Sequence, residues 1–110
     1  MYQRGDIVLL PFPFTDLTAA KTRPAVVVSI EAFQRDTGDV TVAMITSVPR
    51  TTPYDYALQD WQAAHLLRPS WVRAKLATLN PALVRYKPGS LSDTDLAEVE
   101  RRIRLALGHR

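Results

Sequence analysis

The sequence predicts a mainly β protein, built as a small barrel or curled antiparallel sheet with one helix packed on it. Apolar and β-branched stretches come first along the chain, and the one segment with clear helical periodicity comes last. Short connections rich in Pro, Thr, Asp and Gly separate the apolar stretches, as is typical of strands joined by turns. The length of 110 residues and the lack of an internal boundary predict a single domain over 1–110.

Three strands are expected in the first half of the chain. Two of them are almost continuously apolar, and the third is rich in β-branched residues, which favour strands. Pro24 must lie in the first positions of its strand, because proline cannot donate a hydrogen bond to a sheet. Thr37-Gly38-Asp39 supplies turn chemistry. The expected strands are 5–12, 23–30 and 40–48, with a loop over 13–22 and a connection over 31–39.

The second half of the chain is expected to contain one good strand and weaker elements. Residues 70–79 alternate, with Trp71, Arg73 and Lys75 on one face and Val72, Ala74 and Leu76 on the core face. The weaker elements are an exposed strand at 54–59, a helical turn or compact loop at 60–67, and a loop at 80–90 with a short helical piece.

Residues 91–108 predict the terminal helix. Ser92 is a natural N-cap, and acidic side chains follow it in the first turn. Gly108 is expected to end the helix. An apolar stripe at helical spacing is formed by Leu96, Val99, Ile103 and Leu107. The arginines at 101, 102 and 104 follow Glu98 and Glu100 and are interpreted as a solvated face with pairs inside the helix.

The composition excludes several kinds of site. There is no cysteine, which rules out thiol catalysis, disulfides and thiolate zinc sites and fits a reducing, cytoplasmic compartment. The two histidines are His65 and His109, so a histidine-rich metal site is excluded, and the role of His65 stays open. No signal-peptide pattern, membrane-spanning run or glycine-rich phosphate loop is expected. The net charge of +3 permits an anionic partner without requiring one.

Several segments, taken together and in order, resemble one protein family. They are "RGDIVLLPFPFTD", "KTRPAVVVS", "VAMITS" and "DWQAAHLLRPSWVRAKLATLN", followed by the terminal helix. This combination closely resembles the PemK/MazF-type toxins of bacterial type II toxin–antitoxin systems over essentially the whole chain. The resemblance implies an SH3-like small barrel with a C-terminal helix and a homodimer. It also implies sequence-specific cleavage of single-stranded mRNA without metal or other cofactor, which inhibits translation and growth, and a cognate antitoxin that blocks this activity.

Two other functions remain open from the sequence. Relatives with the same fold bind DNA gyrase instead of cutting RNA, so the fold does not decide the activity. An inactive, RNA-binding descendant is the third possibility.

The resemblance assigns site residues one by one. The catalytic arginine of the family's "RP" motif falls on Arg23, and its catalytic Thr or Ser at the end of the third strand falls on Thr46, with Ser47 beside it. An arginine in "VR-x-D" falls on Arg73, but the aspartate position of that motif is Lys75. The stretch before "RP" is "TAAKT", which lacks the glutamate of some members.

The general base therefore has no assigned residue. Asp16 and Lys21, which precede Arg23, are further possible catalytic or RNA-binding residues. Arg23 could alternatively form an ion pair with Asp16 or Asp6.

These assignments fit RNA cleavage by the substrate's own 2′-hydroxyl. A guanidinium stays charged and its planar fork matches phosphate oxygens, so Arg23 suits stabilisation of the phosphorane. Arginine is a poor proton acceptor at neutral pH, so the base is left unnamed.

The resemblance and the charge pattern also predict two kinds of assembly. A groove lined by Arg23, Arg73 and Lys75 is expected to attract an acidic antitoxin tail as well as RNA. The apolar run "PAVVVSI" and the terminal helix are expected to leave hydrophobic surface for a two-fold dimer.

Overall fold

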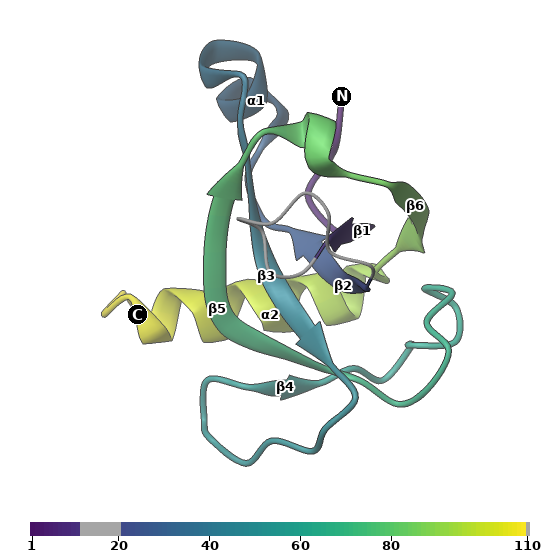
Figure 1. Ribbon diagram of the computed structural model, residues 1–110. Coiled ribbons are helices and arrows are strands. Elements are labelled where there is room, and N and C mark those ends of the chain that lie inside the picture. Colours follow the sequence, from purple (N-terminus) through teal and green to yellow (C-terminus); the bar gives the residue numbers. More distant parts are fainter. Residues whose placement is uncertain (12–20, 110) are drawn as a thin grey trace.

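The computed structural model describes residues 1–11 and 21–109, and these form a curled antiparallel sheet with a long helix along it (Figure 1). The sheet has the strand order β4-β5-β3-β2-β1-β6, and every neighbouring pair is antiparallel. The strands are β1 (Asp6–Pro11), β2 (Thr22–Val27), β3 (Val40–Thr46), β4 (Tyr56–Ala57), β5 (Trp71–Leu79) and β6 (Tyr86–Ser90). The helices are α1 (Glu31–Thr37), the 3₁₀ helix η1 (Pro81–Leu83) and α2 (Asp93–Ala106).

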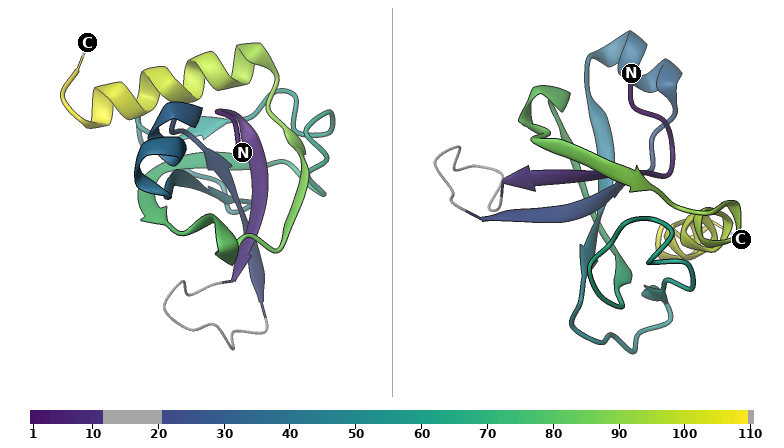
Figure 2. Two further views of the ribbon diagram at one scale, coloured as in Figure 1. Left: turned by 90° about the horizontal axis from the view of Figure 1, so that it is seen from above. Right: turned by 90° about the vertical axis from the view of Figure 1, so that its right-hand side faces the viewer.

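The sheet curls into a half-barrel whose two edges are β4 and β6 (Figure 2). The two views show α2 lying along one side of the sheet and α1 projecting at one end. The expected fold class, a mainly β small barrel with a C-terminal helix, is confirmed. Within the described residues, no helix combines the length and the apolar character that crossing a membrane would need.

Buried side chains lie on both faces of the sheet, which explains why β1, β2 and β3 are almost continuously apolar. The cluster that packs against α2 contains Ile7, Val26, Ala43, Ile45, Tyr56, Leu58, Ala64, Val72, Leu91 and Val99. The cluster on the other face contains Val8, Leu10, Ala25, Val27, Val40, Val42, Met44 and Leu79. Alternate residues of one strand thus enter different clusters.

The terminal helix begins as the sequence predicts and ends close to the predicted residue. The side-chain oxygen of Ser92 accepts a hydrogen bond from the backbone N–H of Asp95 at 3.2 Å. Leu96, Val99 and Ile103 pack on the sheet, but Leu107 lies beyond the last helical residue and is 60% exposed. Gly108 follows with a φ of 85°, a left-handed conformation that glycine adopts easily.

The structure contains two elements that the sequence analysis placed in connections. Residues 31–37 form α1, which ends at Gly38 with a φ of 79°. This helix is short and buries none of its residues, so it lacks the apolar stripe that would reveal it. Residues 86–90 form β6, which pairs with β1 and contains both a proline and a glycine, residues that normally argue against a strand.

The expected core face of β5 is confirmed only in part. Val72 is 2% exposed, whereas Leu76 is 37% exposed. The pairing with β3 shifts between Ala43↔Leu76 and Ile45↔Val72, so β5 has two more residues than β3 across this step. Such an irregularity bends the strand, and the simple alternation of the sequence does not predict it.

Candidate functional site

A cleft of about 890 Å³ opens where the start of β2, the end of β3, β6 and the segment between β4 and β5 approach one another. The described side chains around it are mixed in character, with two arginines, four serines and threonines, one histidine and one tyrosine among apolar groups. They are Leu9, Thr22, Arg23, Pro24, Ile45, Thr46, Ser47, Val48, His65, Leu66, Leu67, Arg68, Ser70, Tyr86 and Pro88. The cleft therefore has the size and polarity of a ligand site.

The register of the sheet brings Arg23 and Thr46 to the same end of one ladder. β2 and β3 pair as Ala25↔Met44, and the same register carried two residues further places Arg23 opposite Thr46. Arg23 also pairs with Leu10 of β1, so its backbone is held by a regular sheet. The Arg23 side chain is exposed and makes no ion pair within the described part of the chain. A fixed strand end thus presents to the cleft a guanidinium that forms no ion pair with residues 1–11 or 21–109.

The alternative of an ion pair between Arg23 and Asp6 is not what the structure shows. The Asp6 carboxylate lies 3.4 Å from the amine of Lys87 and accepts a hydrogen bond from the backbone N–H of Gln3. Asp16, the other acidic partner considered, lies outside the described residues.

Two hydroxyl side chains stand beside Arg23 at the end of β3. Thr46 is half-buried, and its Oγ1 accepts a hydrogen bond of 3.1 Å from the backbone N–H of Val48. That contact fixes the threonine rotamer and leaves its O–H free to donate. Ser47 follows and is exposed. A hydrogen-bond donor and a permanent cation therefore face one cleft, which is suited to binding a phosphate group.

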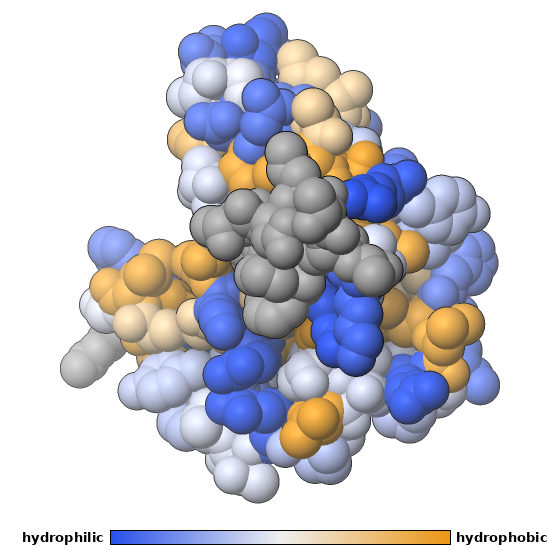
Figure 3. All heavy atoms as spheres, viewed as in Figure 1, coloured by the Kyte–Doolittle hydropathy of each residue, from blue (hydrophilic) through white to orange (hydrophobic). Residues whose placement is uncertain are grey.

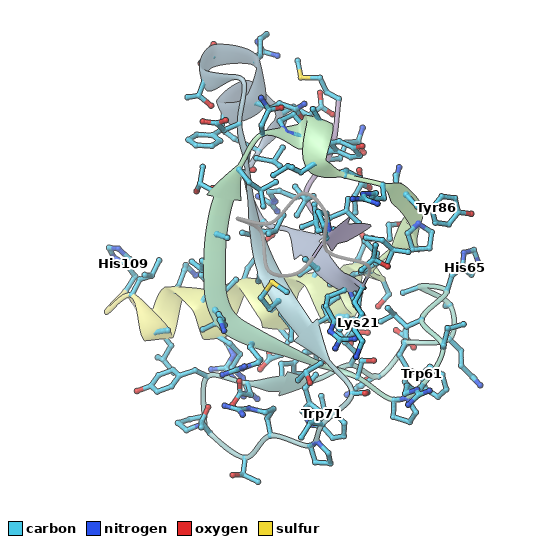
Figure 4. The ribbon with its side chains drawn as sticks, viewed as in Figure 1. Lys21, Trp61, His65, Trp71, Tyr86 and His109 are labelled. Atoms are coloured by element: carbon cyan, nitrogen blue, oxygen red, sulfur yellow. The ribbon has the colours of Figure 1, made fainter. Side chains whose placement is uncertain are left out.

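Three other predicted residues, Arg73, Lys75 and Lys21, are not among the described residues that line this cleft. Arg73 and Lys75 line a separate hollow of about 370 Å³. Its other described lining residues are Arg50, Thr52, Tyr54, Asp55, Ala74 and Ala106. The structure thus divides the expected groove of Arg23, Arg73 and Lys75 into two hollows. Lys21 is exposed at the residue before β2 (Figure 4).

Hydrophilic side chains lie near both hollows on one face of the molecule. In Figure 3 they gather over the ends of β2 and β3 and over the lower half of β5. This shared polar face is the part of the surface on which a polyanion would contact both sets of cations.

Among the cleft residues that were not assigned to the site from the sequence are His65, Arg68 and Tyr86. Arg68 adds a second exposed cation to the lining. His65 and Tyr86 lie on one side of the molecule, whereas His109 lies at the opposite side, beyond the end of α2 (Figure 4). Recognising Tyr86 as a cleft residue from the sequence would have required the prediction of β6, because Tyr86 lies in this strand.

The clear pKa shifts among the described residues lie away from this cleft. Burial, helped by a hydrogen bond to Asp95, raises the pKa of Tyr56 above its ordinary value. Hydrogen bonds from Arg101 and then Arg102 lower the pKa of Glu98 to about 2. Over residues 1–11 and 21–109, no three His, Asp or Glu side chains are grouped so that they could hold a metal ion.

Comparisons with known proteins agree with this architecture. The chain resembles an endoribonuclease from a mycobacterial species, solved with its cognate antitoxin, with a TM-score of 0.83, 22% identity and coverage of 98% of this chain and 96% of the other. It also resembles the Deinococcus radiodurans MazE-MazF complex (Form-II), with a TM-score of 0.77, 26% identity and coverage of 99% and 97%.

A further likeness is to the MazF of Deinococcus radiodurans (Form-I), with a TM-score of 0.75, 27% identity and coverage of 97% of this chain and 96% of the other. No curated protein sequence gave a significant match. The family model that matches, over residues 3–107, describes the PemK-like, MazF-like toxin of type II toxin–antitoxin systems. The chain therefore belongs to the PemK-like, MazF-like family of toxins of type II toxin–antitoxin systems.

Proposed function

We propose that this toxin is a metal-independent endoribonuclease that cuts single-stranded mRNA at specific sequences and so inhibits translation and growth. The observation that carries the proposal is that Arg23 and Thr46, at the ends of the paired strands β2 and β3, line one cleft. Both groups are held by strands, and preorganised donors of this kind stabilise developing charge without reorganisation. The mycobacterial endoribonuclease with the same fold supports this choice of reaction.

In the proposed reaction the substrate supplies the nucleophile. The ribose 2′-oxygen attacks the adjacent phosphorus while its proton passes to a base, and the bond from phosphorus to the 5′-oxygen breaks. The leaving 5′-oxygen takes up a proton. The products are a 2′,3′-cyclic phosphate and a 5′-hydroxyl. Arg23 neutralises the phosphorane oxygens, and Thr46 donates a hydrogen bond to them.

The partners follow from the same site. An acidic antitoxin segment is expected to bind the cations of the two hollows and to compete with RNA. The toxin is expected to act in the cytoplasm as a homodimer, with the polar face open to mRNA.

The decisive experiment incubates the purified protein with single-stranded RNA in excess EDTA. Cleavage that leaves cyclic phosphate and 5′-hydroxyl ends supports the proposal. Replacing the ribose before the cut with deoxyribose should stop cleavage and leave binding largely intact, because the phosphate contacts remain. Cutting of the deoxy-substituted strand, or 5′-phosphate ends, would contradict the mechanism. Stalled gyrase complexes without RNA cleavage would establish the gyrase alternative instead.

A further inference from the structure

The wall of the cleft formed by β6 carries an aromatic side chain that is not packed in the core. Tyr86 is 63% exposed although it lies in a strand, and it does not belong to either buried cluster. Pro88 lies two residues further along β6, so both side chains are on the same face of this strand, and both line the cleft. An exposed tyrosine beside a rigid proline, inside a cleft, is a surface on which a flat ring can stack.

His65 is fixed beside this surface. Its Nδ1 lies 2.7 Å from the carbonyl oxygen of Pro88, so this nitrogen donates and carries the proton in the neutral ring. Its backbone φ is 64°, the left-handed region that residues other than glycine rarely occupy. No described residue makes a hydrogen bond to Nε2, which is therefore available as an acceptor.

The packing of β6 against the 60–67 segment holds this geometry in place. A Cβ on Gly89 would lie 2.7 Å from the carbonyl oxygen of Ala64 and 3.2 Å from Nδ1 of His65. Ala64 is itself fully buried, so the segment cannot move aside without disturbing the core. The close approach requires glycine at position 89 and keeps the imidazole next to Pro88.

The distribution of charge in the cleft indicates where the phosphate and the base of a bound nucleotide would lie. Arg23 and Arg68 supply positive charge, and the described lining contains no acidic side chain. Phosphates are attracted to the arginines, whereas the wall of Tyr86, Pro88 and His65 offers a ring surface and one acceptor. Unstacked bases of single-stranded RNA are bound in this way, by stacking on aromatic rings and by hydrogen bonds to their edges.

We propose that the Tyr86–Pro88–His65 wall is a nucleobase-binding subsite for a nucleotide next to the phosphate held by Arg23. Tyr86 stacks on the base, and Nε2 of His65 accepts a hydrogen bond from an N–H of the base edge. This inference rests on the proposed ribonuclease function and adds to it a determinant of sequence preference. His65 and Tyr86 act on binding and on the choice of cleavage site, not on the bond that breaks.

The first test measures binding to a strand in which deoxyribose blocks cleavage. Tyr86→Ala should weaken binding about 5- to 100-fold, the range for losing one base–aromatic stack. Tyr86→Phe should bind within about 3-fold of the wild type, because the ring remains. Equal binding of the wild type and Tyr86→Ala would overturn the subsite, provided that the wild type binds RNA. A wild type that neither binds nor cleaves RNA would overturn the subsite and the ribonuclease proposal together.

The second test locates the base with abasic nucleotides placed one at a time along the strand. At one position, removing the base should weaken binding to the wild type as much as Tyr86→Ala weakens binding to the intact strand. Tyr86→Ala should then bind this abasic strand no more weakly than it binds the intact strand, because the same stack is lost in both cases. Losses that add at every position would overturn the stacking assignment.

The third test isolates Nε2 of His65. Asparagine tolerates positive φ and can still donate to Pro88, so His65→Asn removes Nε2 and keeps the loop. On RNA of randomised sequence, His65→Asn should relax the preference at one nucleotide, whereas the matched His109→Asn should leave it unchanged. An unchanged preference in His65→Asn would overturn the role of this nitrogen.

Discussion

At the scale of single residues, Arg23 carries most of the proposed chemistry. Arg23→Ala should lower the rate of RNA cleavage by about 10²–10³, the effect of losing one preorganised charge-stabilising donor. Because the exposed side chain makes no ion pair in the described part of the chain, unfolding free energy should change by less than about 1 kcal/mol. Single-turnover cleavage and urea unfolding measure the two effects. Arg35→Ala, an exposed arginine on α1, is the control and should change neither.

Thr46 provides a weaker, neutral donor, and its replacement should cost less. Thr46→Ala should lower the cleavage rate in the same assay, but by a smaller factor than Arg23→Ala, because a neutral hydrogen bond stabilises less than a charged one. Thr46→Ser keeps the hydroxyl and should retain most activity. A full rate in Thr46→Ala would show that this hydroxyl does not contact the reacting phosphate.

The resemblance to the family indicated these two residues, and the structure adds that each stands at the end of a strongly apolar strand. The start of β2 and the end of β3 meet because the two strands pair as antiparallel neighbours. Arg23 and Thr46 are therefore close in space although they are far apart in the sequence. His65 and Tyr86 could not be indicated in this way. His65 lies in an irregular segment, and its side chain is held by a contact with Pro88 that is distant in the sequence. Tyr86 lies in β6, whose proline and glycine argue against a strand in the sequence.

At the scale of elements, α2 is attached to the sheet by a buried polar contact. The hydroxyl of Tyr56 on β4 donates to Oδ1 of Asp95, which is fully buried, at 2.7 Å. The backbone N–H groups of Gln59 and Asp60 donate to the same carboxylate at 3.2 and 2.9 Å. Short β4 is thus tied to α2 by side-chain bonds rather than by a long ladder.

Removing the tyrosine hydroxyl should weaken this attachment. Tyr56→Phe leaves a buried carboxylate short of one donor, and we expect it to lower the unfolding free energy by about 1–3 kcal/mol. Urea unfolding monitored by circular dichroism measures the change. Tyr54→Phe, which removes a hydroxyl from a tyrosine that is 43% exposed, should have little effect. Equal losses in both variants would mean that the hydrogen bond to Asp95 contributes nothing net.

Glu98 stabilises the same helix through its two arginines. Arg101 and Arg102 donate to it, which lowers its pKa from 4.5 to about 2. Arg102 also donates to the carbonyl oxygens of Pro53 and Asp55, so the carboxylate orients a link between α2 and the β3–β4 loop. A group whose folded pKa is lowered stabilises the protein above its unfolded pKa and loses this effect as the pH falls.

The contribution of Glu98 to stability is therefore expected to depend on pH. Glu98→Gln should lower the Tm at pH 7, by an amount that corresponds to no more than about 1 kcal/mol because the pair is partly exposed. The difference from the wild type should shrink as the pH falls from about 4.5 towards about 2. Thermal melts at several pH values measure this, with Asp36→Asn on α1 as control. A difference that stays constant down to pH 2 would contradict the role of the ion pairs.

The elements that the sequence predicted and those it missed differ in how they are stabilised. β1, β2 and β3 bury side chains on both faces, and Ser92 caps α2, so local patterns identify all four. By contrast, α1 buries none of its residues, and β6 is stabilised by pairing with β1. β6 thus depends on a pairing distant in sequence, and α1 lacks an apolar stripe, so local patterns identify neither element.

At the scale of the whole molecule, the exposed apolar surface differs from what the sequence suggested. Ala25, Val26 and Val27 of β2 are 0% exposed, so this part of the run "PAVVVSI" offers no surface to a second copy. Leu105 and Leu107 remain 40% and 60% exposed, and Figure 3 shows hydrophobic surface over the C-terminal end of α2. If the expected homodimer forms through apolar contact, this end of the helix is one exposed apolar surface of the described residues that can take part in it.

The last prediction concerns this assembly. Light scattering at micromolar concentration should give the mass of a dimer, and Leu105→Glu combined with Leu107→Glu should give a monomer, because charges cannot be buried at an apolar interface. Ile30→Glu, at a residue 53% exposed beside α1, should stay dimeric. A monomeric wild type would exclude the dimer, and a dimeric double variant would exclude this surface. Since Ala106, between the two leucines, lines the hollow of Arg73 and Lys75, a partner docked here would extend that hollow with its own surface.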